Sequence, residues 1–221
     1  MAHRVRITGV EDVTHDVRRF SFERPAGFVF EPGQATDVAI DRDGWRDEKR
    51  PFTFTGLKDW DHLEFTIKIY PDHGGVTNQL GGLKKGDALL IEDPWGTIRY
   101  KGRGTFIAGG AGVTPFIAIL RDLEDKGEIA GHRLIFSNRT ERDIILRETW
   151  EAMQGLDRLF LVTDEPASRL AGGRIDADFL KRNIRDFGQH FYVCGPDGMV
   201  ADVNAALKEL GASPDALVFE R

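Results

Sequence analysis

Gly109-Gly110-Ala111-Gly112-Val113-Thr114-Pro115 forms a glycine-rich stretch near the middle of the chain. The apolar, β-prone run Thr105–Ala108 comes before it, as a buried parallel strand would. Apolar residues follow at helical spacing between Phe116 and Leu123. Glycine lets a ligand approach the backbone closely, and the unpaired N–H groups at a helix start attract anions. The stretch therefore predicts a nucleotide phosphate site made of Gly110, Gly112, Val113, Thr114 and Pro115, with Thr114 capping the helix and Pro115 as its first residue.

One residue of this stretch departs from the usual dinucleotide-binding pattern. Pro115 stands where G-x-G-x-x-G has its third small residue. Taken alone, the stretch is therefore also compatible with a tight strand-to-helix turn that binds no ligand.

The composition is typical of a folded protein without a membrane span. The 221 residues are 41% hydrophobic and 30% charged, and no apolar stretch approaches the ~20 residues that a span requires. The formal charge of −6 argues against nucleic acid as a partner. The single cysteine, Cys194, excludes an intrachain disulfide and a four-cysteine iron–sulfur cluster, and the six histidines show no metal-ligand spacing. We expect a cytoplasmic, monomeric protein without a metal site.

The chain changes character near residue 102, which predicts a domain at residues 1–101 and another at 102–221. The first part has short β-prone runs separated by turn residues, a pattern typical of an antiparallel barrel, and one helical patch at Val76–Leu83. Its predicted strands are Val5–Thr8, Val17–Phe22, Ala35–Ile40, Phe52–Thr55, Leu63–Tyr70, Ala88–Glu92 and Thr97–Tyr100.

In the second part, strands and helices alternate, which predicts an α/β domain with a parallel sheet. Ligands of such domains bind at the carboxyl ends of the strands. The predicted strands are Gly104–Ala108, Arg133–Ser137, Leu159–Thr163 and Phe191–Cys194, and the predicted helices are Pro115–Lys126, Leu146–Met153, Asp176–Asn183 and Asp197–Leu210.

A second glycine turn follows the last of these predicted strands. Cys194-Gly195-Pro196 ends the apolar run that begins at Phe191 and opens a helix containing Met199. In a parallel sheet this turn would lie at the same edge as the stretch at 109–115. Cys194 would then face the nucleotide crevice, although a cysteine at a strand end is also commonly a small buried apolar residue.

A third motif, Arg50-Pro51-Phe52-Thr53, lies in the barrel part. Strand alternation places Arg50 and Phe52 on one face and Thr53 on the other. An arginine can pair with a pyrophosphate, an aromatic ring can lie on a flat ring, and a threonine hydroxyl can bond to a ring nitrogen. The alternative is an ordinary edge strand with an exposed arginine.

The fourth motif is Gly75-Val76-Thr77, which opens the helical patch of the barrel part. Its N–H groups and the Thr77 hydroxyl could hold a second phosphate beside the strand Ile67-Lys68-Ile69-Tyr70. A capped surface helix is the alternative interpretation.

The choice between NADH and NADPH depends on the residues after the second strand of the α/β part. Sites that prefer NAD place an acidic residue there, whereas this chain has Ser137-Asn138-Arg139. A hydroxyl and a guanidinium suit a 2′-phosphate, so the sequence favours NADPH slightly. Glu141 and Asp143 follow closely and could reverse the local charge, and Arg174 is a further candidate contact.

The order of the four motifs resembles that of the ferredoxin–NADP reductase superfamily across almost the whole chain. Its members include flavodoxin reductases, flavin reductases, cytochrome b5 reductases and the reductase components of oxygenases. The resemblance implies a barrel domain that binds FAD, followed by an α/β domain that binds NADH or NADPH.

The resemblance also implies roles for single residues. Arg50 would contact the flavin phosphates, Phe52 would stack on the isoalloxazine, and Thr53 would lie near the reactive flavin nitrogen. Cys194 would lie close to the nicotinamide, and Glu220 resembles an acidic residue near the flavin in some members. Thr53, Cys194 and Glu220 are therefore the candidate catalytic residues. The implied cofactor-binding residues are Arg50 to Thr53, Ile67 to Tyr70, Gly75 to Thr77, Gly110, Gly112 to Pro115, Ser137 to Arg139, Cys194 to Pro196 and Met199.

Three positions depart from the pattern of the superfamily. Phe52 stands where relatives often have tyrosine, and Asp93-Pro94-Trp95-Gly96 stands where a Gly-Pro-x-Gly turn is common. Many relatives end with an aromatic residue that covers the second flavin face, and Phe219 is the candidate here.

The predicted function is an FAD-dependent oxidoreductase that takes hydride from NAD(P)H and passes electrons to a flavodoxin- or ferredoxin-type carrier protein. Hydride transfer between stacked rings depends on proximity and orientation, so no catalytic acid–base pair is required. A reductase of small molecules, such as free flavin or a ferric chelate, is the first alternative. A non-catalytic docking or electron-transfer subunit is the second.

Overall fold

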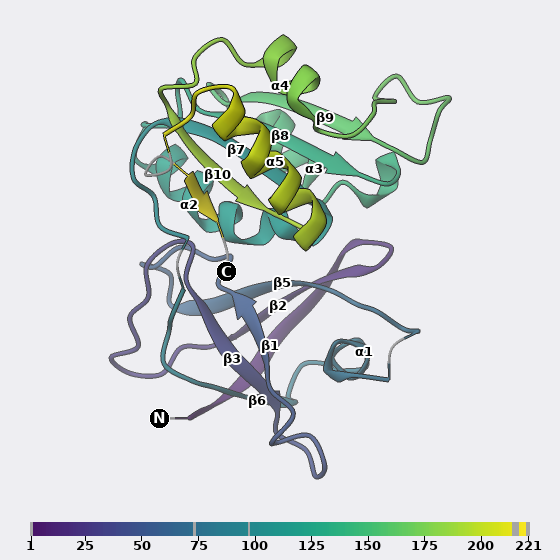
Figure 1. Cartoon of the computed structure of the whole chain (residues 1–221). Helices are drawn as coiled ribbons and strands as arrows, with labels where there is room; N and C mark the ends of the chain where they lie inside the picture. The colour runs from purple at the N-terminus through teal and green to yellow at the C-terminus, as the bar shows by residue number, and fades with distance from the viewer. Residues whose placement is uncertain (1, 73, 97, 214–216, 220–221) are drawn as a thin grey trace. The chain divides into compact units, whose positions relative to one another are not determined.

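The computed structural model describes residues 2–72, 74–96, 98–213 and 217–219. These form two compact units, each built around one sheet (Figure 1). The first unit comprises Met1–Arg99 with Thr114–Asp122, and the second comprises Tyr100–Val113 with Leu123–Arg221.

The sheet of the first unit has six antiparallel strands in the order β4-β3-β6-β1-β2-β5. An antiparallel bridge between Phe54 and Phe65 joins its two edges, so the sheet closes on itself. Closure satisfies the backbone groups that an open edge would leave unpaired. The predicted antiparallel domain is confirmed. Its elements are β1 (His3–Thr14), β2 (Val17–Glu23), β3 (Ala35–Ile40), β4 (Arg50–Thr53), β5 (His62–Lys68), α1 (Val76–Leu80) and β6 (Ala88–Ile91).

Aromatic rings form the centre of the first unit's core. The ring centroid of Phe54 lies 4.5 Å from that of Phe30 and 5.2 Å from that of Phe65. The ring centroid of Phe22 also lies 4.6 Å from that of Phe65. β5 departs from simple alternation, because all its residues from Leu63 to Ile67 are buried. Its polar residues must therefore find partners inside the protein.

The sheet of the second unit has five parallel strands in the order β11-β10-β7-β8-β9. Four of them were predicted, and the short β11 was missed because three residues give no usable periodicity. The predicted parallel α/β domain is confirmed. The elements are β7 (Gly104–Gly109), η1 (Gly110–Val113), α2 (Thr114–Asp125), β8 (Arg133–Asn138), η2 (Glu141–Asp143), α3 (Arg147–Ala152), β9 (Asp157–Val162), α4 (Ala177–Asn183), β10 (His190–Cys194), α5 (Asp197–Glu209) and β11 (Leu217–Phe219).

Helices α4 and α5 cover one face of this sheet. Phe179 and Leu180 of α4 and Val203 and Leu207 of α5 pack with Ile107 and other strand residues in one apolar cluster. The start of α4 agrees with the prediction, since the Asp176 side chain accepts a 2.8 Å hydrogen bond from the backbone N–H of Phe179. Among the described residues, no helix is long and apolar enough to cross a membrane.

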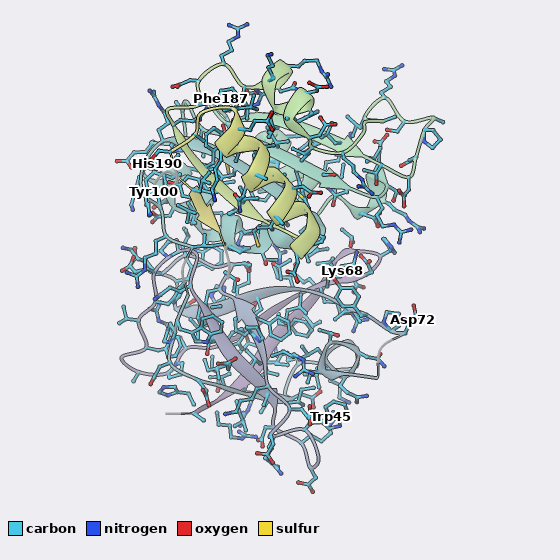
Figure 2. All side chains as sticks on the ribbon, in the orientation of Figure 1. Trp45, Lys68, Asp72, Tyr100, Phe187 and His190 are labelled. Atoms are coloured by element: carbon cyan, nitrogen blue, oxygen red, sulfur yellow. The ribbon has the colours of Figure 1, made fainter. Side chains whose placement is uncertain are left out.

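The predicted strand Thr97–Tyr100 is wrong for Ile98–Tyr100, which form no strand. Tyr100, labelled in Figure 2, instead belongs to the second unit and packs with its aromatic residues. Its ring stacks on Tyr192 at 6.1 Å, and its hydroxyl lies 2.9 Å from Nε2 of His132. The Tyr192 hydroxyl accepts from the N–H groups of Lys101 and Gly102, which fixes the connecting segment. These tertiary contacts override the local β propensity.

Several helix boundaries also differ from the sequence-based expectation, and those of α2 and α1 have a clear local cause. α2 begins directly from the 3₁₀ turn η1, so Thr114 is its first residue rather than its cap and Pro115 is its second. Gly110 starts this turn with φ +51°, a conformation that glycine adopts easily. α1 ends at Leu80 rather than Leu83, because Gly81 and Gly82 follow and glycine weakens a helix.

His132 is a buried histidine held in the neutral form. Its Nδ1 lies 3.0 Å from the carbonyl oxygen of Ile129, so Nδ1 donates there and Nε2 accepts from Tyr100. Burial lowers the pKa of His132 below its ordinary value near 6.5, and the charge of Arg103 lowers it further, against the opposing effects of Ile129 and Glu128.

We expect stability to fall as the pH falls from about 7 towards 5. In that range the unfolded imidazole takes up a proton before the folded one does, so protonation favours the unfolded state by at most about 1.4 kcal/mol per pH unit. Thermal unfolding across this range should show a shallower pH dependence for His132→Gln than for the wild type. His62→Gln, at a partly exposed histidine of the first unit, is the control. Equal slopes for His132→Gln and wild type would contradict the assignment.

Candidate functional site

Three strands of the second unit end at the same edge of the sheet. The register pairs Cys194 with Ala108 and Gly109 with Ser137, so β7, β8 and β10 end side by side. The two predicted glycine turns begin at this edge.

The two turns pack backbone against backbone. A Cβ on Gly112 would lie 2.4 Å from the carbonyl oxygen of Cys194, and one on Gly195 would lie 3.1 Å from the amide nitrogen of Gly109. A Cβ on Gly109 would lie 2.4 Å from the sulfur of Met199. Because no larger residue fits at Gly112, its glycine is required by this close approach. The structure thus brings together the turn residues that the sequence singled out.

Two features show that this edge suits a nucleotide. A Cβ on Gly110 would meet no atom within 4 Å, so the backbone there is open to a ligand. Asn138, at the end of β8, is 5% exposed, and neither polar atom of its amide has a hydrogen-bond partner among the described residues. An unpaired buried amide costs about 1–3 kcal/mol, which a ligand carrying complementary groups would recover.

Beside this edge lies a cavity of about 300 Å³, lined by Ser137, Arg174, Ile175, Gly198, Met199 and Asp202. Ser137, Met199 and Arg174 were candidates from the sequence. Asp202 was missed, although it follows Met199 at the i, i+3 spacing that places both on one side of α5. The cavity therefore presents one cation and one anion to an occupant.

Arg139 is not among the residues that line this cavity. Its Nε lies 2.8 Å from Oδ2 of Asp164, and this hydrogen bond lowers the pKa of the Asp164 carboxyl. The Arg139 guanidinium is thus already paired, while its side chain is 82% exposed.

In the first unit, the Arg50–Thr53 motif forms β4. Arg50 and Pro51 are exposed, Phe52 is half-buried, and Thr53 is buried at 9% exposure. Arg50 donates to the carbonyl oxygen of Lys49 at 2.6 Å, and no carboxylate of the described chain pairs with it. Among the residues that the structure describes, the Thr53 hydroxyl makes no hydrogen bond. A cation, an aromatic ring and a hydroxyl therefore remain available for a ligand, as the FAD assignment requires.

β5 supplies Ile67 and Lys68, while Ile69 and Tyr70 lie just beyond its end. Nζ of Lys68 lies 2.9 Å from Oδ2 of Asp16 and 6.0 Å from the ring centroid of Tyr70. Burial raises the pKa of Asp16, but the hydrogen bonds from Lys68 and Thr14 outweigh it and leave this pKa below its usual value. The Lys68 ammonium is therefore neutralised within the protein, and Tyr70 remains 40% exposed.

Gly75 precedes α1, and no side chain caps this helix. A Cβ on Gly74 or Gly75 would meet no atom within 4 Å. Val76 anchors the helix in the core, while Thr77 is partly exposed. The backbone before α1 is thus accessible to a phosphate.

Two further sequence-based assignments concern the chain end and the turn at residues 93–96. Glu220 lies outside the described residues, and Phe219 is described only as part of β11. Gly96 has φ +140°, and Trp95 pairs with Ala35 through a bridge while its indole donates to Asp37 at 3.1 Å.

Comparisons with known proteins match two separate parts of the chain. A model described as the oxidoreductase FAD-binding domain matches residues 4–100, and a model described as the oxidoreductase NAD-binding domain matches residues 106–205. The chain belongs to the ferredoxin reductase-like superfamily.

The chain is similar to several members of this ferredoxin reductase-like superfamily. It is 29% identical to NADH-cytochrome b5 reductase 1 of Bos taurus, over 96% of this chain and 83% of the relative. It is also 29% identical to the reductase component of propane 2-monooxygenase from Rhodococcus jostii (strain RHA1), over 99% of this chain and 63% of that relative. A ferredoxin NADP+ reductase from Neisseria gonorrhoeae, solved with FAD and NADP, has the same fold, with a TM-score of 0.85, 20% identity and coverage of 99% and 98%.

The ferredoxin reductase-like chain is therefore an oxidoreductase with FAD and a pyridine nucleotide as cofactors. The residues present fit both groups. Arg50, Phe52 and the open backbone at Gly75 would hold FAD, while Gly110 and Asn138 would hold the pyridine nucleotide.

Replacing Gly112 with alanine should lower the affinity for NAD(P)H at least about tenfold. The new Cβ forces the turn away from Cys194, and overpacking of this kind costs about 1–3 kcal/mol. Calorimetric titration with NADP+ and NAD+ measures the affinity, and FAD binding should be unchanged. Gly173→Ala, where a Cβ meets no atom within 4 Å, is the matched control. Wild-type nucleotide affinity in Gly112→Ala would contradict the assignment of the turn.

Proposed function

We propose that this chain is a reductase that takes hydride from NAD(P)H on a bound FAD and delivers electrons to a carrier protein of flavodoxin or ferredoxin type. The observation that carries the proposal is the pairing, in one chain, of two surfaces with unsatisfied polar groups and open backbone. One is the β4 motif with Gly75, and the other is the pair of glycine turns with Asn138.

When bound, FAD accepts a hydride and releases electrons singly or in pairs. The residues of the chain itself bind the cofactors and orient their rings. Arg50 neutralises a phosphate, Phe52 lies against a flat ring, and Thr53 offers its hydroxyl to a ring atom. Cys194, at the end of β10, and Glu220 are proposed to position the nicotinamide and the flavin. With one cysteine in the chain, an iron–sulfur cluster held by four cysteines would have to belong to a partner.

The acceptor is the part of the proposal that rests on the relatives. One of the two relatives is named as a reductase of cytochrome b5 and the other as the reductase component of a monooxygenase, so both names point to a protein that receives electrons. This supports a protein acceptor over a small molecule. Steady-state reduction of flavodoxin, ferredoxin, cytochrome b5, free flavin and a ferric chelate would rank the candidates.

We keep the sequence-based preference for NADPH over NADH. We propose that Arg174 is the residue that binds the 2′-phosphate of NADPH. Arg174 and Ser137 line the cavity beside the glycine turns, whereas Arg139 is paired with Asp164. The carboxylate of Asp202, which lines the same cavity, would repel a 2′-phosphate and so favour NADH. One relative is also named for NADH. The balance between Arg174 and Asp202 would therefore set the preference.

The function is tested directly by anaerobic reduction of the protein loaded with FAD. We expect the purified protein to bind FAD and its yellow colour to bleach on addition of NADPH, and more slowly with NADH. Stopped-flow absorbance of the flavin band measures both rates. A protein that binds FAD but is bleached by neither nucleotide would support the non-catalytic subunit instead.

Arg174→Ala should weaken NADPH binding about 10- to 100-fold and leave NADH binding nearly unchanged. A hydrogen bond to a charged group contributes about 1.5–3 kcal/mol, and only NADPH carries the 2′-phosphate. Arg169→Ala, an exposed arginine that does not line the cavity, is the control. Equal losses for both nucleotides would remove the assignment of Arg174 to the 2′-phosphate.

A further inference from the structure

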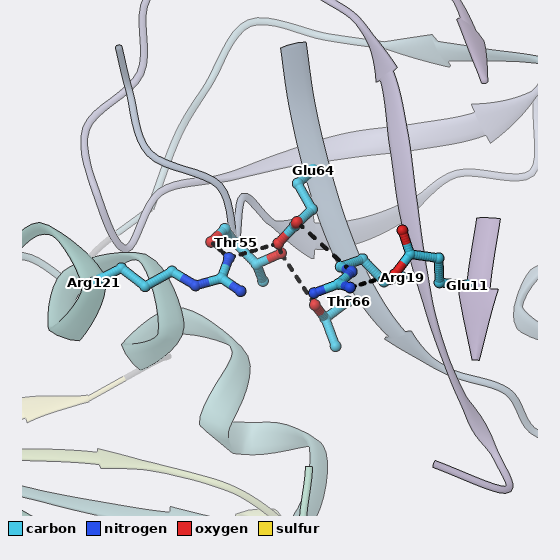
Figure 3. Close-up of polar contacts among 6 residues, drawn as sticks. All are labelled: Glu11, Arg19, Thr55, Glu64, Thr66 and Arg121. Carbon is cyan, nitrogen blue, oxygen red and sulfur yellow. Dashed lines mark hydrogen bonds and ion pairs between the residues drawn. The ribbon is translucent and has the colours of Figure 1, made fainter. Parts of the chain in front are cut away.

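A buried carboxylate, Glu64 on β5, lies at the centre of a polar network in the first unit (Figure 3). Its side chain is 5% exposed. Oε1 accepts from Nη1 of Arg121 at 2.7 Å and from the hydroxyl of Thr55 at 2.8 Å. Arg19 lies 3.9 Å from the other carboxylate oxygen and pairs in turn with Glu11. The charge of Glu64 is thus fully compensated inside the protein.

Arg121 lies on α2, and its guanidinium is held by several contacts at once. Nη1 also donates to the carbonyl oxygen of Thr55 at 2.7 Å, and the guanidinium carbon lies 5.5 Å from the ring centroid of Trp60. A Cβ on Gly56 would lie 2.9 Å from that indole, so the ring position requires glycine there. Arg24 donates to the carbonyl oxygen of Trp60 at 2.8 Å and holds the loop in place.

The two ends of this network lie close in sequence to the two candidate binding segments. Thr55 is separated from Thr53 of β4 only by Phe54, and it pairs with Glu64 by a 2.9 Å backbone hydrogen bond. Arg121 lies on the same continuous helix as Thr114, which directly follows the turn Gly110–Val113. The Arg121–Glu64 pair therefore links the strand of the proposed flavin motif to the helix that begins at the nucleotide turn.

Stability alone does not account for a buried pair of this kind. Removing two charges from water costs about as much free energy as their attraction returns, and well-packed apolar residues often stabilise such a site equally well or better. The pair instead fixes the position of the Arg121 side chain relative to its two acceptors. Nη1 of Arg121 donates both to the Glu64 carboxylate and to the backbone carbonyl of Thr55, so a displacement of Arg121 relative to these two residues breaks both bonds.

We propose that Arg121 and Glu64 are positioning residues for hydride transfer, an inference that rests on the proposed function. They hold the segment Thr114–Asp122 of α2 in one register against Thr55, and so fix the start of the helix on which the nucleotide turn depends. Neither side chain touches a reacting atom. Their loss misplaces the hydride donor rather than weakening its binding, and misplacement by about 1 Å can cost about 100-fold in rate.

The test uses the full-length protein loaded with FAD and the double variant Glu64→Met/Arg121→Met. An apolar pair of similar volume should preserve the fold, the unfolding temperature and the affinities for FAD and NAD(P)H. The limiting rate of anaerobic flavin reduction at saturating NAD(P)H should fall about 10- to 100-fold. Hydrogen–deuterium exchange of the protein without cofactors should increase in the peptides covering residues 110–122, a readout independent of activity.

Arg121→Lys keeps the charge but removes the planar guanidinium that lies over the Trp60 ring, and it provides the second variant if the double variant fails to fold. It should lower the limiting rate by a smaller factor, with unchanged nucleotide affinity. Arg133→Met/Asp157→Met, which removes a partly exposed ion pair of the second unit, is the matched control and should keep the wild-type rate.

A limiting rate within twofold of wild type in a folded Glu64→Met/Arg121→Met or Arg121→Lys protein would overturn the positioning role. A loss of rate that merely follows a loss of FAD or nucleotide affinity would overturn it as well. Failure of the proposed function gives a different result, because in that case neither NADPH nor NADH bleaches the flavin of the wild-type protein.

Discussion

The close approach of two backbone turns in the second unit is the constraint on which its binding edge depends. Gly112 lies against the carbonyl group of Cys194 at a distance that leaves no room for a side chain. This contact requires β7 and β10 to be parallel neighbours that end together, as the register has them. It also leaves Gly110 facing open space, where a phosphate can approach the backbone. One steric condition thus sets both the ends of the strands and the accessibility of the turn.

Polar groups at the candidate binding sites are satisfied differently from those that hold the first unit together, and the difference separates structural from binding residues. The charges that fix the first unit are paired: Glu64 with Arg121, Lys68 with Asp16, and Arg19 with Glu11. At the candidate sites, among the described residues, the Asn138 amide has no hydrogen-bond partner, and the Arg50 guanidinium bonds to the Lys49 carbonyl but to no carboxylate. Since buried polar groups are normally satisfied, an unpaired one at a strand end points to an absent ligand.

Much of the fold follows from local patterns. Short β-prone runs between turn residues predicted an antiparallel domain, and alternating strands and helices predicted a parallel one, and both are confirmed. Errors arose where a tertiary contact outweighed local propensity. Tyr100 leaves the predicted strand because its ring stacks on Tyr192 and its hydroxyl meets His132, neither of which is near in sequence. The start of α2 was misplaced by one residue because the η1 turn has no distinct sequence pattern.

The sequence by itself determined the two kinds of sheet and the superfamily, and it supplied the segments proposed to bind the cofactors, because glycine turns, proline-fixed strands and hydrophobic periodicity are local properties. Only the tertiary structure decided which charges are free and which are already paired. Arg139 proved to be engaged by Asp164, and Asp202 proved to share a cavity with Arg174. The Glu64–Arg121 pair, separated by 57 positions, leaves no pattern in the sequence. Pairing of charges depends on distances in space, and only the folded chain brings these side chains within reach of each other.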